Sequence, residues 1–313
     1  MEPIITVDHL LKKYKKAQSN AVDDISFNVN PGEFFCLLGP NGAGKTTTIS
    51  ILTTTLSKTS GTVKIAGFDL DTHPSSVRQR IGVIFQNPSL DINLTAEENV
   101  RFHSILYHIY PFAPTFSLMP KAYQKRVWDL ASLLGIEKDI FKPIKSFSGG
   151  MKRKLEIIRS LMHQPKILFL DEPSSGLDPI TRKSLWEYLD DVRQKQNTTI
   201  FLTTHYLEEA EDATHICVIN HGKIISFGTP AMLKKNLIEE YLLVSAKDTK
   251  KLLAELTSHK LHYTEGEYIK IDLGSHSAQE VISRIKTPLT SLKIHTPTLE
   301  EAYVEIIDQN ERN

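Results

Sequence analysis

Short runs of apolar residues alternate along much of the chain with segments whose apolar residues recur every three or four positions. Runs of the first kind are typical of strands, and spacing of the second kind is typical of helices. We therefore expect strands at Ile4–Val7, Ser26–Asn30, Glu33–Leu38, Gly61–Ile65, Ile81–Phe85, Lys166–Leu170, Thr198–Thr204, Ile216–Asn220 and Ile224–Phe227. Helical spacing follows the third strand at Thr47–Leu52 and occurs again at Thr181–Gln194, so the pattern predicts an α/β domain.

Residues 94–162 interrupt this alternation with a mostly helical insertion. Thr95 and Glu98 have the spacing of a capping box, which predicts that a helix begins there. Helical periodicity returns in two later segments, Lys121–Gly135 and Lys152–His163. The stretch Tyr107–Pro120 is rich in aromatic residues and contains three prolines, which forbid a continuous helix. It is either a packed surface loop or an apolar patch for a partner.

The last part of the chain has a different order of elements. Strands and helices are expected at Tyr241–Ala246, Asp248–Ser258, Lys260–Tyr263, Tyr268–Leu273, Ala278–Ile285 and Ser291–His295, followed by a last helix. The resulting order β-α-β-β-α-β is ferredoxin-like, and it carries no catalytic constellation. We expect a main domain at residues 1–237 and a regulatory or dimer-stabilising accessory domain at residues 238–313.

The segment Gly39–Thr46 reads Gly-Pro-Asn-Gly-Ala-Gly-Lys-Thr and stands between an expected strand and an expected helix. Strand, glycine-rich turn and helix follow one another in this order in a phosphate-binding loop. Successive backbone N–H groups must point inward around a phosphate, and the helix places its positive dipole end on the same anion. The sequence therefore predicts that the chain binds a nucleoside triphosphate.

Single residues of this loop have separate expected roles. The inward-pointing N–H groups require φ values that glycine adopts freely, and we expect Gly39, Gly42 and Gly44 to supply them. Lys45 is expected to neutralise the β- and γ-phosphates. The hydroxyl of Thr46 is expected to ligate Mg²⁺.

Polar residues follow three of the expected strands. Asp171 and Glu172 come directly after a buried strand, where one carboxylate can hold Mg²⁺ and the other can orient or deprotonate the hydrolytic water. Burying both charges without a cation would be costly. His205 ends the next strand, where a γ-phosphate would lie. Gln86 also follows a strand, within reach of the metal or the water, because α/β sites form beyond the carboxyl ends of strands.

Two further features each have two interpretations. The triplet Ser148-Gly149-Gly150 precedes a helix, and it is either a second phosphate-binding turn or a simple helix N-cap. The cluster Lys12–Lys16 surrounds Tyr14. It is either a solvated loop or a site where the tyrosine stacks on a purine base and the lysines attract the polyphosphate.

Composition narrows the class of protein. The 313 residues include 37 basic and 37 acidic ones, so nothing points to a nucleic-acid partner. Cys36 and Cys217 lie in apolar runs and are expected to be buried thiols. The N-terminus lacks the pattern of a signal peptide, and no window approaches the roughly 18–20 apolar residues of a membrane span. We expect a protein in the cytosol, or one that faces it from a membrane.

These motifs together resemble those of the ATP-binding subunit of an ABC transporter, over about Ile4–Leu237. Gly39–Thr46 is similar to the Walker A loop and Ile167–Asp171 to the Walker B strand. Ser175–Asp178 resembles the D-loop, and Phe147–Met151 resembles the signature loop, with methionine in place of the usual glutamine. The resemblance also implies roles for four single residues: Tyr14 stacks on adenine, Gln86 forms the Q-loop, Glu172 is the catalytic glutamate and His205 is the switch histidine.

The resemblance implies a RecA-like P-loop NTPase fold with antiparallel β and helical subdomains, and the cofactors ATP and Mg²⁺. The catalytic residues that it implies are Lys45, Gln86, Glu172 and His205. The nucleotide contacts that it implies are Tyr14, Gly39, Pro40, Asn41, Gly42, Ala43, Gly44, Lys45, Thr46, Thr47, Ser148, Gly149, Gly150 and Asp178. The metal ligands that it implies are Thr46, Gln86 and Asp171.

The tail indicates a branch of that family. Pro297–Glu305 is similar to the C-terminal motif of ATPases from the drug- and polysaccharide-exporter branch, the daunorubicin-resistance type. Ser148–Lys154 fits that branch too, and Phe112–Leu118 is an insertion relative to it. The resemblance implies a head-to-tail pair with a second copy or a homologous ATPase subunit, at the cytoplasmic face of the membrane. A separate transmembrane permease would then be the driven subunit.

The alternative is a soluble ABC ATPase that acts on ribosomes or DNA. Ribosome-acting members usually carry two nucleotide domains in one chain, and repair members carry long coiled coils. This chain has one nucleotide domain and no sustained heptads, which favours the exporter.

Overall fold

The structure is a computed structural model that describes residues 2–85, 89–174, 176–235, 240–274 and 276–312. The chain divides into two compact units after Phe227, and each unit has its own hydrophobic core. This division falls earlier than the expected one at residues 237/238. The reason is that helix α8 (Pro230–Lys235) packs on the last helix, α11 (Leu299–Arg312), and so belongs to the second unit.

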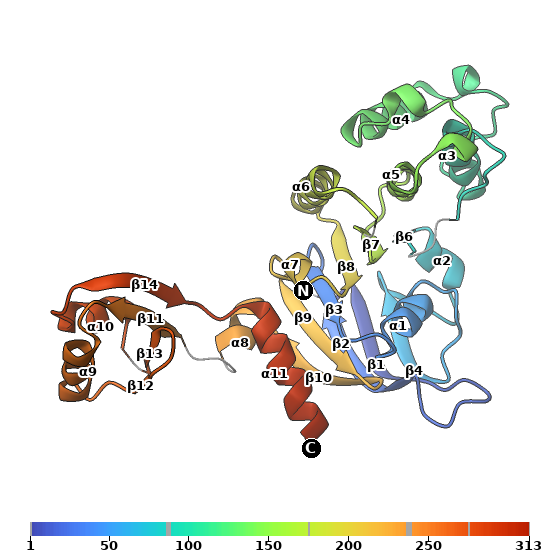
Figure 1. Ribbon diagram of the computed structural model, residues 1–313. Helices are drawn as coiled ribbons and strands as arrows, with labels where there is room; N and C mark the ends of the chain where they lie inside the picture. The colour runs from blue at the N-terminus through green and yellow to red at the C-terminus, as the bar shows by residue number, and fades with distance from the viewer. Residues whose placement is uncertain (1, 86–88, 175, 236–239, 275, 313) are drawn as a thin grey trace. The chain divides into compact units, whose positions relative to one another are not determined.

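The first unit is built on a six-stranded sheet with the order β10-β9-β3-β8-β7-β6 (Figure 1). Its strands are β3 (Phe34–Leu38), β6 (Ile81–Ile84), β7 (Ile167–Asp171), β8 (Thr199–Thr204), β9 (His215–Asn220) and β10 (Lys223–Gly228). The five strands from β9 to β6 run parallel. The segments that follow β3, β7 and β8 therefore meet at one edge of the sheet, because parallel strands end on the same side.

A second, antiparallel sheet has the order β2-β1-β4-β5. Its strands are β1 (Ile5–Lys12), β2 (Val22–Val29), β4 (Ser60–Ile65) and β5 (Phe68–Asp69). The two sheets share one core, in which Phe27 of β2 stacks on Phe35 of β3 with ring centroids 5.2 Å apart. Helix α1 (Lys45–Leu52) buries Ile49, Ile51 and Leu52 in the same core. This packing fixes the helix whose N-terminus carries the glycine-rich loop.

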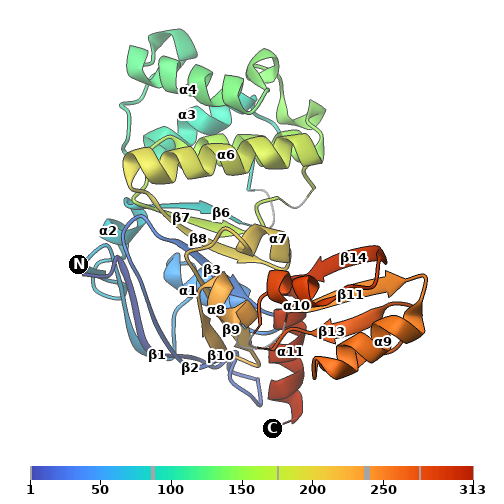
Figure 2. The same cartoon turned by 90° about the vertical axis from the view of Figure 1, so that its left-hand side faces the viewer.

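The helical insertion contains α3 (Ala96–Leu106), α4 (Lys121–Leu133) and α5 (Gly149–Leu161). Thr95 caps α3 as predicted: its hydroxyl accepts from the Glu98 N–H at 3.2 Å, and the Glu98 carboxylate accepts from the Thr95 N–H at 2.8 Å. Helix α5 packs against α3, α4 and strand β6 and so joins the insertion to the parallel sheet. Figure 2 shows α6 (Pro179–Gln196) running along the parallel sheet on the same side as α3 and α4. The unit also contains the short α-helices α2 (Pro74–Arg78) and α7 (Leu207–Ala210).

The stretch Tyr107–Pro120 forms no continuous helix, as its prolines predicted; it contains the short 3₁₀ helix Phe116–Leu118. The Phe116 ring packs edge-on against Trp128 and Phe141, with centroids 6.2 and 5.2 Å away. Phe112 is 70% exposed. Tyr107 and Tyr110 also pack, on His103 and Tyr123. The stretch is therefore a loop that packs through several aromatic rings and presents Phe112 to solvent.

The second unit has the order β11 (Tyr241–Ala246), α9 (Thr249–Ser258), β12 (Tyr263–Thr264), β13 (Ile269–Asp272), α10 (Ala278–Arg284), β14 (Leu289–His295) and α11. Its antiparallel sheet is ordered β12-β13-β11-β14, which confirms the predicted β-α-β-β-α-β arrangement. Strand β12 begins later than the expected Lys260. Lys260 has a φ of 55°, and the Leu261 N–H bonds back to the Leu256 carbonyl, so both residues close the end of α9.

Candidate active site

The phosphate loop adopts the predicted backbone at two of its three glycines. Gly42 and Gly44 have φ values of 81° and 109°, in the left-handed region that favours glycine. Gly39 does not lie in that region, so its predicted role as a positive-φ residue is wrong. A Cβ at Gly39 would instead lie 2.2 Å from the carbonyl oxygen of Ile219 in β9. Close approach of a neighbouring strand, rather than φ, requires glycine there.

Lys45 is the first residue of α1 and is only 7% exposed. Its ammonium donates hydrogen bonds to the carbonyl oxygens of Gly39 and Pro40, at 2.6 and 3.0 Å. Burial lowers the pKa of Lys45, while the nearby carboxylates of Glu172 and Asp171 oppose that shift. The loop therefore holds a buried cation within electrostatic range of the acidic pair Asp171-Glu172 at the end of β7.

Asp171 is the last residue of β7 and is nearly fully buried. Its carboxylate accepts a hydrogen bond from the Thr203 hydroxyl of the adjacent strand β8. Burial raises the pKa of Asp171, and the Thr203 hydrogen bond counteracts this effect. A buried carboxylate whose charged form is penalised in this way is a strong site for a cation.

Glu172 follows immediately and has a φ of 50°. A non-glycine residue pays about 1–2 kcal/mol for this left-handed conformation, and such residues cluster at functional sites. The Glu172 N–H donates to the Thr203 carbonyl at 2.9 Å, which anchors the turn. The Glu172 side chain reaches His205, with Nδ1 of the ring 2.9 Å from Oε1 of the carboxylate. The structure thus brings together the two residues that the sequence placed after neighbouring strands.

Tyr14 lies beside the start of α1. Its hydroxyl is 3.4 Å from the Thr47 hydroxyl, its ring is 44% exposed, and the Lys12 ammonium lies 5.4 Å from the ring centroid. An exposed aromatic ring therefore lies beside the first turn of α1, and the Lys12 ammonium next to it donates to the Ser57 carbonyl.

Ser148 caps helix α5, and its hydroxyl accepts from the Met151 N–H at 3.3 Å. Ser148 and Gly149 are exposed, and a Cβ at Gly149 would meet open space. Asp178 caps α6 in a similar way, with its carboxylate accepting from the Thr181 N–H at 3.0 Å. Both residues are therefore helix caps in this chain, and the turn at Ser148 additionally presents free space at a helix N-terminus.

Several other predicted site residues belong to the glycine-rich loop and differ in their exposure to solvent. Asn41, Gly42 and Thr46 are exposed, and Ala43 is buried. Gln86 and Ser175 lie outside the described residues.

The described donors around the loop fit Mg²⁺. The Thr46 hydroxyl is exposed on the second residue of α1, and Asp171 supplies a buried carboxylate. Both are hard oxygen donors of the kind that Mg²⁺ prefers, together with phosphates and water. Among the described residues, no group of three or more His, Cys, Asp or Glu is arranged to hold a metal ion.

Arg153 of α5 is a residue of this site that the sequence analysis did not single out. Its side chain is 4% exposed and donates to the carbonyl oxygens of Asp171 at 2.9 Å and Glu172 at 2.8 Å. It also donates to the Pro173 carbonyl at 2.9 Å and pairs with buried Glu156 at 3.3 Å. The sequence does indicate this ion pair, because Arg153 and Glu156 are spaced i, i+3 on the apolar face of a predicted helix.

Glu209 of α7 is a second unpredicted residue. It is buried, and it accepts hydrogen bonds from the hydroxyls of Ser174 and Thr204, the latter at 2.7 Å. These two hydroxyls stand close in the chain to Glu172 and His205 respectively. Glu209 therefore ties α7 to both strand ends that carry the acidic residue and the histidine.

A glycine-rich loop at a helix N-terminus, with a buried lysine facing an acidic pair at a neighbouring strand end, defines a P-loop nucleoside triphosphatase. The profile of the ABC transporter family matches residues 22–175. The chain belongs to this family, and its first unit is an ABC-type ATP-binding and ATP-hydrolysing domain.

Two curated relatives illustrate the similarity. The chain is 38% identical to the Nod factor export ATP-binding protein I of Ralstonia nicotianae over 229 residues, which are 73% of this chain and 68% of the relative. It is 36% identical to the doxorubicin resistance ATP-binding protein DrrA of Mycobacterium tuberculosis over 249 residues, 79% of this chain and 72% of the relative.

Solved structures agree with the fold. An ATP-binding subunit of an ABC transporter matches with a TM-score of 0.65 and 28% identity, over 74% of this chain and 92% of that one. A dimeric ATP-binding cassette in a post-hydrolysis state with ADP and Pi matches with a TM-score of 0.65 and 25% identity, over 72% and 98% of the two chains. Within the described part of this chain, no helix combines the length and apolar character that crossing a bilayer requires.

Proposed function

We propose that the chain is the motor of a membrane exporter and works as a head-to-tail pair around two ATP molecules. The observation that carries this proposal is the gathering of Lys45, Glu172 and His205 at one sheet edge. The phosphate loop of one copy binds ATP from one side, and Ser148–Gly150 of a second copy closes the other side with the N-terminus of its α5. ATP is then the contact between the copies, and hydrolysis removes it.

Within that arrangement, each residue of the edge has a distinct task. Lys45 leaves the loop carbonyls to bind the β- and γ-phosphates. Glu172 polarises the attacking water, and His205 holds the Glu172 carboxylate in position and contacts the γ-phosphate. Tyr14 stacks on the adenine. Thr46, Asp171 and Gln86 would hold Mg²⁺, which would neutralise phosphate charge when bound.

Replacing Lys45 by Ala is expected to weaken ATP binding by about 10- to 100-fold, because charge-assisted hydrogen bonds to the phosphates are lost. Isothermal titration with Mg²⁺ and ATP measures this change. Lys64→Ala is the matched control, since Lys64 is exposed on β4, and it should bind ATP like the wild type. Unchanged ATP affinity in Lys45→Ala would contradict the assigned role.

The permease contact is proposed at a cavity of about 420 Å³ where the helical insertion meets the sheet. Its wall includes His103 of α3, and Arg159 and His163 at the end of α5. Nδ1 of each histidine and Nε of Arg159 are buried without a hydrogen-bond partner among the described residues. Buried polar atoms normally have partners, so a cytoplasmic segment of the permease that supplies them fits this cavity.

These histidines give the first unit a pH dependence. Burial lowers the pKa of His103 to about 3, and it also lowers the pKa of His163. Below pH 6.5 these histidines bind a proton in the unfolded chain but stay neutral in the folded chain. The free energy of unfolding therefore falls as the pH falls, by about 1.4 kcal/mol per pH unit for one such histidine. His103→Asn is expected to reduce this slope between pH 6.5 and 4.

Urea unfolding followed by tryptophan fluorescence measures the slope, because Trp128 and Trp186 both lie in the first unit. The control is His108→Asn, which replaces an exposed histidine whose φ of 54° asparagine tolerates. It should keep the wild-type slope. Equal slopes in His103→Asn and the wild type would contradict a His103 that stays neutral in the folded chain.

Export, rather than import, is proposed from the names of the relatives, which denote Nod factor export and doxorubicin resistance. A motor of this kind lies at the cytoplasmic face of the membrane, bound to a separate permease. The test is a pull-down of tagged Glu172→Gln protein with ATP, from solubilised membranes and from cytosol of the native host. Stoichiometric recovery of a multi-span membrane protein supports the proposal, and recovery of ribosomes or DNA instead overturns it.

A further inference from the structure

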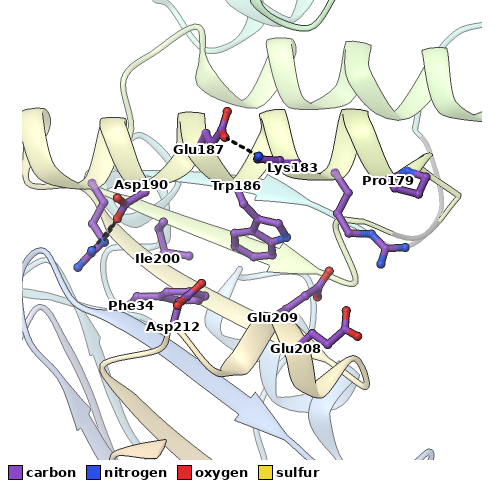
Figure 3. Close-up of a pocket in the computed structure, with 12 residues that line it drawn as sticks. Phe34, Pro179, Lys183, Trp186, Glu187, Asp190, Ile200, Glu208, Glu209 and Asp212 are labelled. Atoms are coloured by element: carbon purple, nitrogen blue, oxygen red, sulfur yellow. Dashed lines mark hydrogen bonds and ion pairs between the residues drawn. The ribbon is translucent and has the colours of Figure 1, made fainter.

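A second cavity lies in the first unit between α6, α7 and the parallel sheet, and no step of ATP hydrolysis uses it (Figure 3). Its volume is about 730 Å³, which is within the range of pockets that hold drug-sized molecules. Trp186 extends from α6 into this space above Phe34 of β3, and the two rings stack with centroids 5.6 Å apart. The cavity therefore has an aromatic wall on which a planar ligand can stack.

The charges around the cavity favour a cation. Two ion pairs on α6 add no net charge to the lining: Lys183 pairs with Glu187 at 3.9 Å, and Arg193 pairs with Asp190 at 2.6 Å. The other charged residues of the lining are Arg182 on one side and Glu208, Glu209 and Asp212 on the other, which gives 1 − 3 = −2. An aromatic wall next to excess negative charge is the arrangement that binds organic cations.

Two buried N–H groups on α6 indicate a further property of the ligand. Trp186 and Arg182 both line the cavity, and the buried Nε1 of Trp186 and Nε of Arg182 have no hydrogen-bond partner among the described residues. Both groups can only donate, so the missing partner is an acceptor such as a carbonyl or ether oxygen. The Arg182 guanidinium stacks over Tyr206, 5.3 Å from the ring centroid, which holds it beside α7.

We propose that this cavity is an effector site for a planar aromatic cation that carries an oxygen acceptor, separate from the nucleotide site. The cation faces Glu208 and Asp212, the planar body stacks on Trp186, and the acceptor oxygen faces α6. Glu209 connects the cavity to the nucleotide site, because it lines the cavity and holds Ser174 and Thr204. Ligand and ATP therefore change one another's affinity by the same factor.

Two xanthene dyes of similar shape and opposite charge test the site. Rhodamine 6G is a planar cation with an ester carbonyl, and fluorescein is a planar anion. Fluorescence polarisation of the dyes with the full chain is expected to show saturable one-to-one binding of rhodamine 6G, at least about tenfold tighter than that of fluorescein. Equal binding of the two dyes, or no saturable binding of rhodamine 6G, would overturn the proposal.

Three variants locate the binding. Trp186→Ala is expected to weaken rhodamine 6G binding by about tenfold, and Asp212→Asn by about two- to fivefold. Asp191→Asn is the matched control, because Asp191 pairs with Lys195 at 2.6 Å on α6 and does not line the cavity. It should bind the dye like the wild type. Should Trp186→Ala fail to fold, Asp212→Asn alone decides the location, and unchanged binding there rules this cavity out.

The link to the nucleotide site has its own readout. The affinity of rhodamine 6G for the Glu172→Gln protein is expected to change by at least about threefold when saturating ATP is added. An unchanged affinity would reduce the cavity to a binding site without a regulatory role. The dye titrations without nucleotide do not depend on hydrolysis or on dimerisation, so their result is independent of the proposed motor function.

Discussion

Replacement of Glu172 by Gln is expected to lower ATP turnover by about 10²–10⁴-fold while ATP binding is retained. The carboxylate stands 2.9 Å from His205 Nδ1 at the strand end that faces the phosphate loop. A glutamine amide has the size of the carboxylate and can still accept that hydrogen bond, but it cannot take a proton from the attacking water. Phosphate release measures turnover, and isothermal titration measures ATP affinity.

The control for this experiment is Glu265→Gln, an exposed carboxylate in the second unit, which should hydrolyse ATP at the wild-type rate. Turnover within about threefold of wild type in Glu172→Gln would be incompatible with general-base catalysis by Glu172. Loss of ATP affinity together with turnover would show instead that the substitution damages the binding loop.

Replacement of Arg153 by Leu is expected to destabilise the first unit by about 3–5 kcal/mol, because it breaks the buried ion pair with Glu156 and leaves that carboxylate only the more distant cation of Arg159, at 3.8 Å. The substitution also removes the donors to the carbonyl oxygens of Asp171 and Glu172, so the two carboxylates lose their fixed position. ATP turnover should therefore fall even under conditions where the variant is folded. Urea unfolding followed by tryptophan fluorescence gives the stability.

Two further variants separate the causes. Lys154→Leu replaces the next, half-exposed cation on α5 and should change stability by less than about 1 kcal/mol. The double variant Arg153→Leu/Glu156→Leu removes both buried charges and should recover part of the lost stability, because a buried ion pair can be replaced by apolar side chains. Full stability of Arg153→Leu alone would exclude Arg153 as a structural link between α5 and β7.

The sequence predicted those parts of the site that depend on local order along the chain. Strand, glycine loop and helix are contiguous at Gly39–Thr46, and the acidic pair follows its own strand directly. The parallel sheet then brings Glu172 and His205 together, because each residue ends a neighbouring strand. This step required only the rule that parallel strands end at one edge.

Other features depend on contacts between distant segments, and the pattern alone did not predict them. Gly39 is constrained by β9, which lies far along the chain, so its role differed from the expected one. Arg153 donates to carbonyl oxygens nearly twenty positions away. Glu209 accepts hydrogen bonds from the hydroxyl of Ser174, which follows β7, and from the hydroxyl of Thr204 at the end of β8. In the second unit, Lys260 adopts a helix-closing conformation that the sequence pattern did not predict. Strand β12 therefore begins at Tyr263 and not at Lys260.

In the proposed arrangement, ATP joins two copies through the phosphate loop of one and Ser148 of the other. Light scattering on Glu172→Gln protein, with and without ATP, measures this association directly. A monomer without ATP and a dimer with ATP are expected, and the additional substitution Ser148→Arg should abolish the dimer while ATP still binds. A monomer in the presence of saturating ATP, or a dimer that tolerates Ser148→Arg, would contradict the proposed ATP-linked dimer.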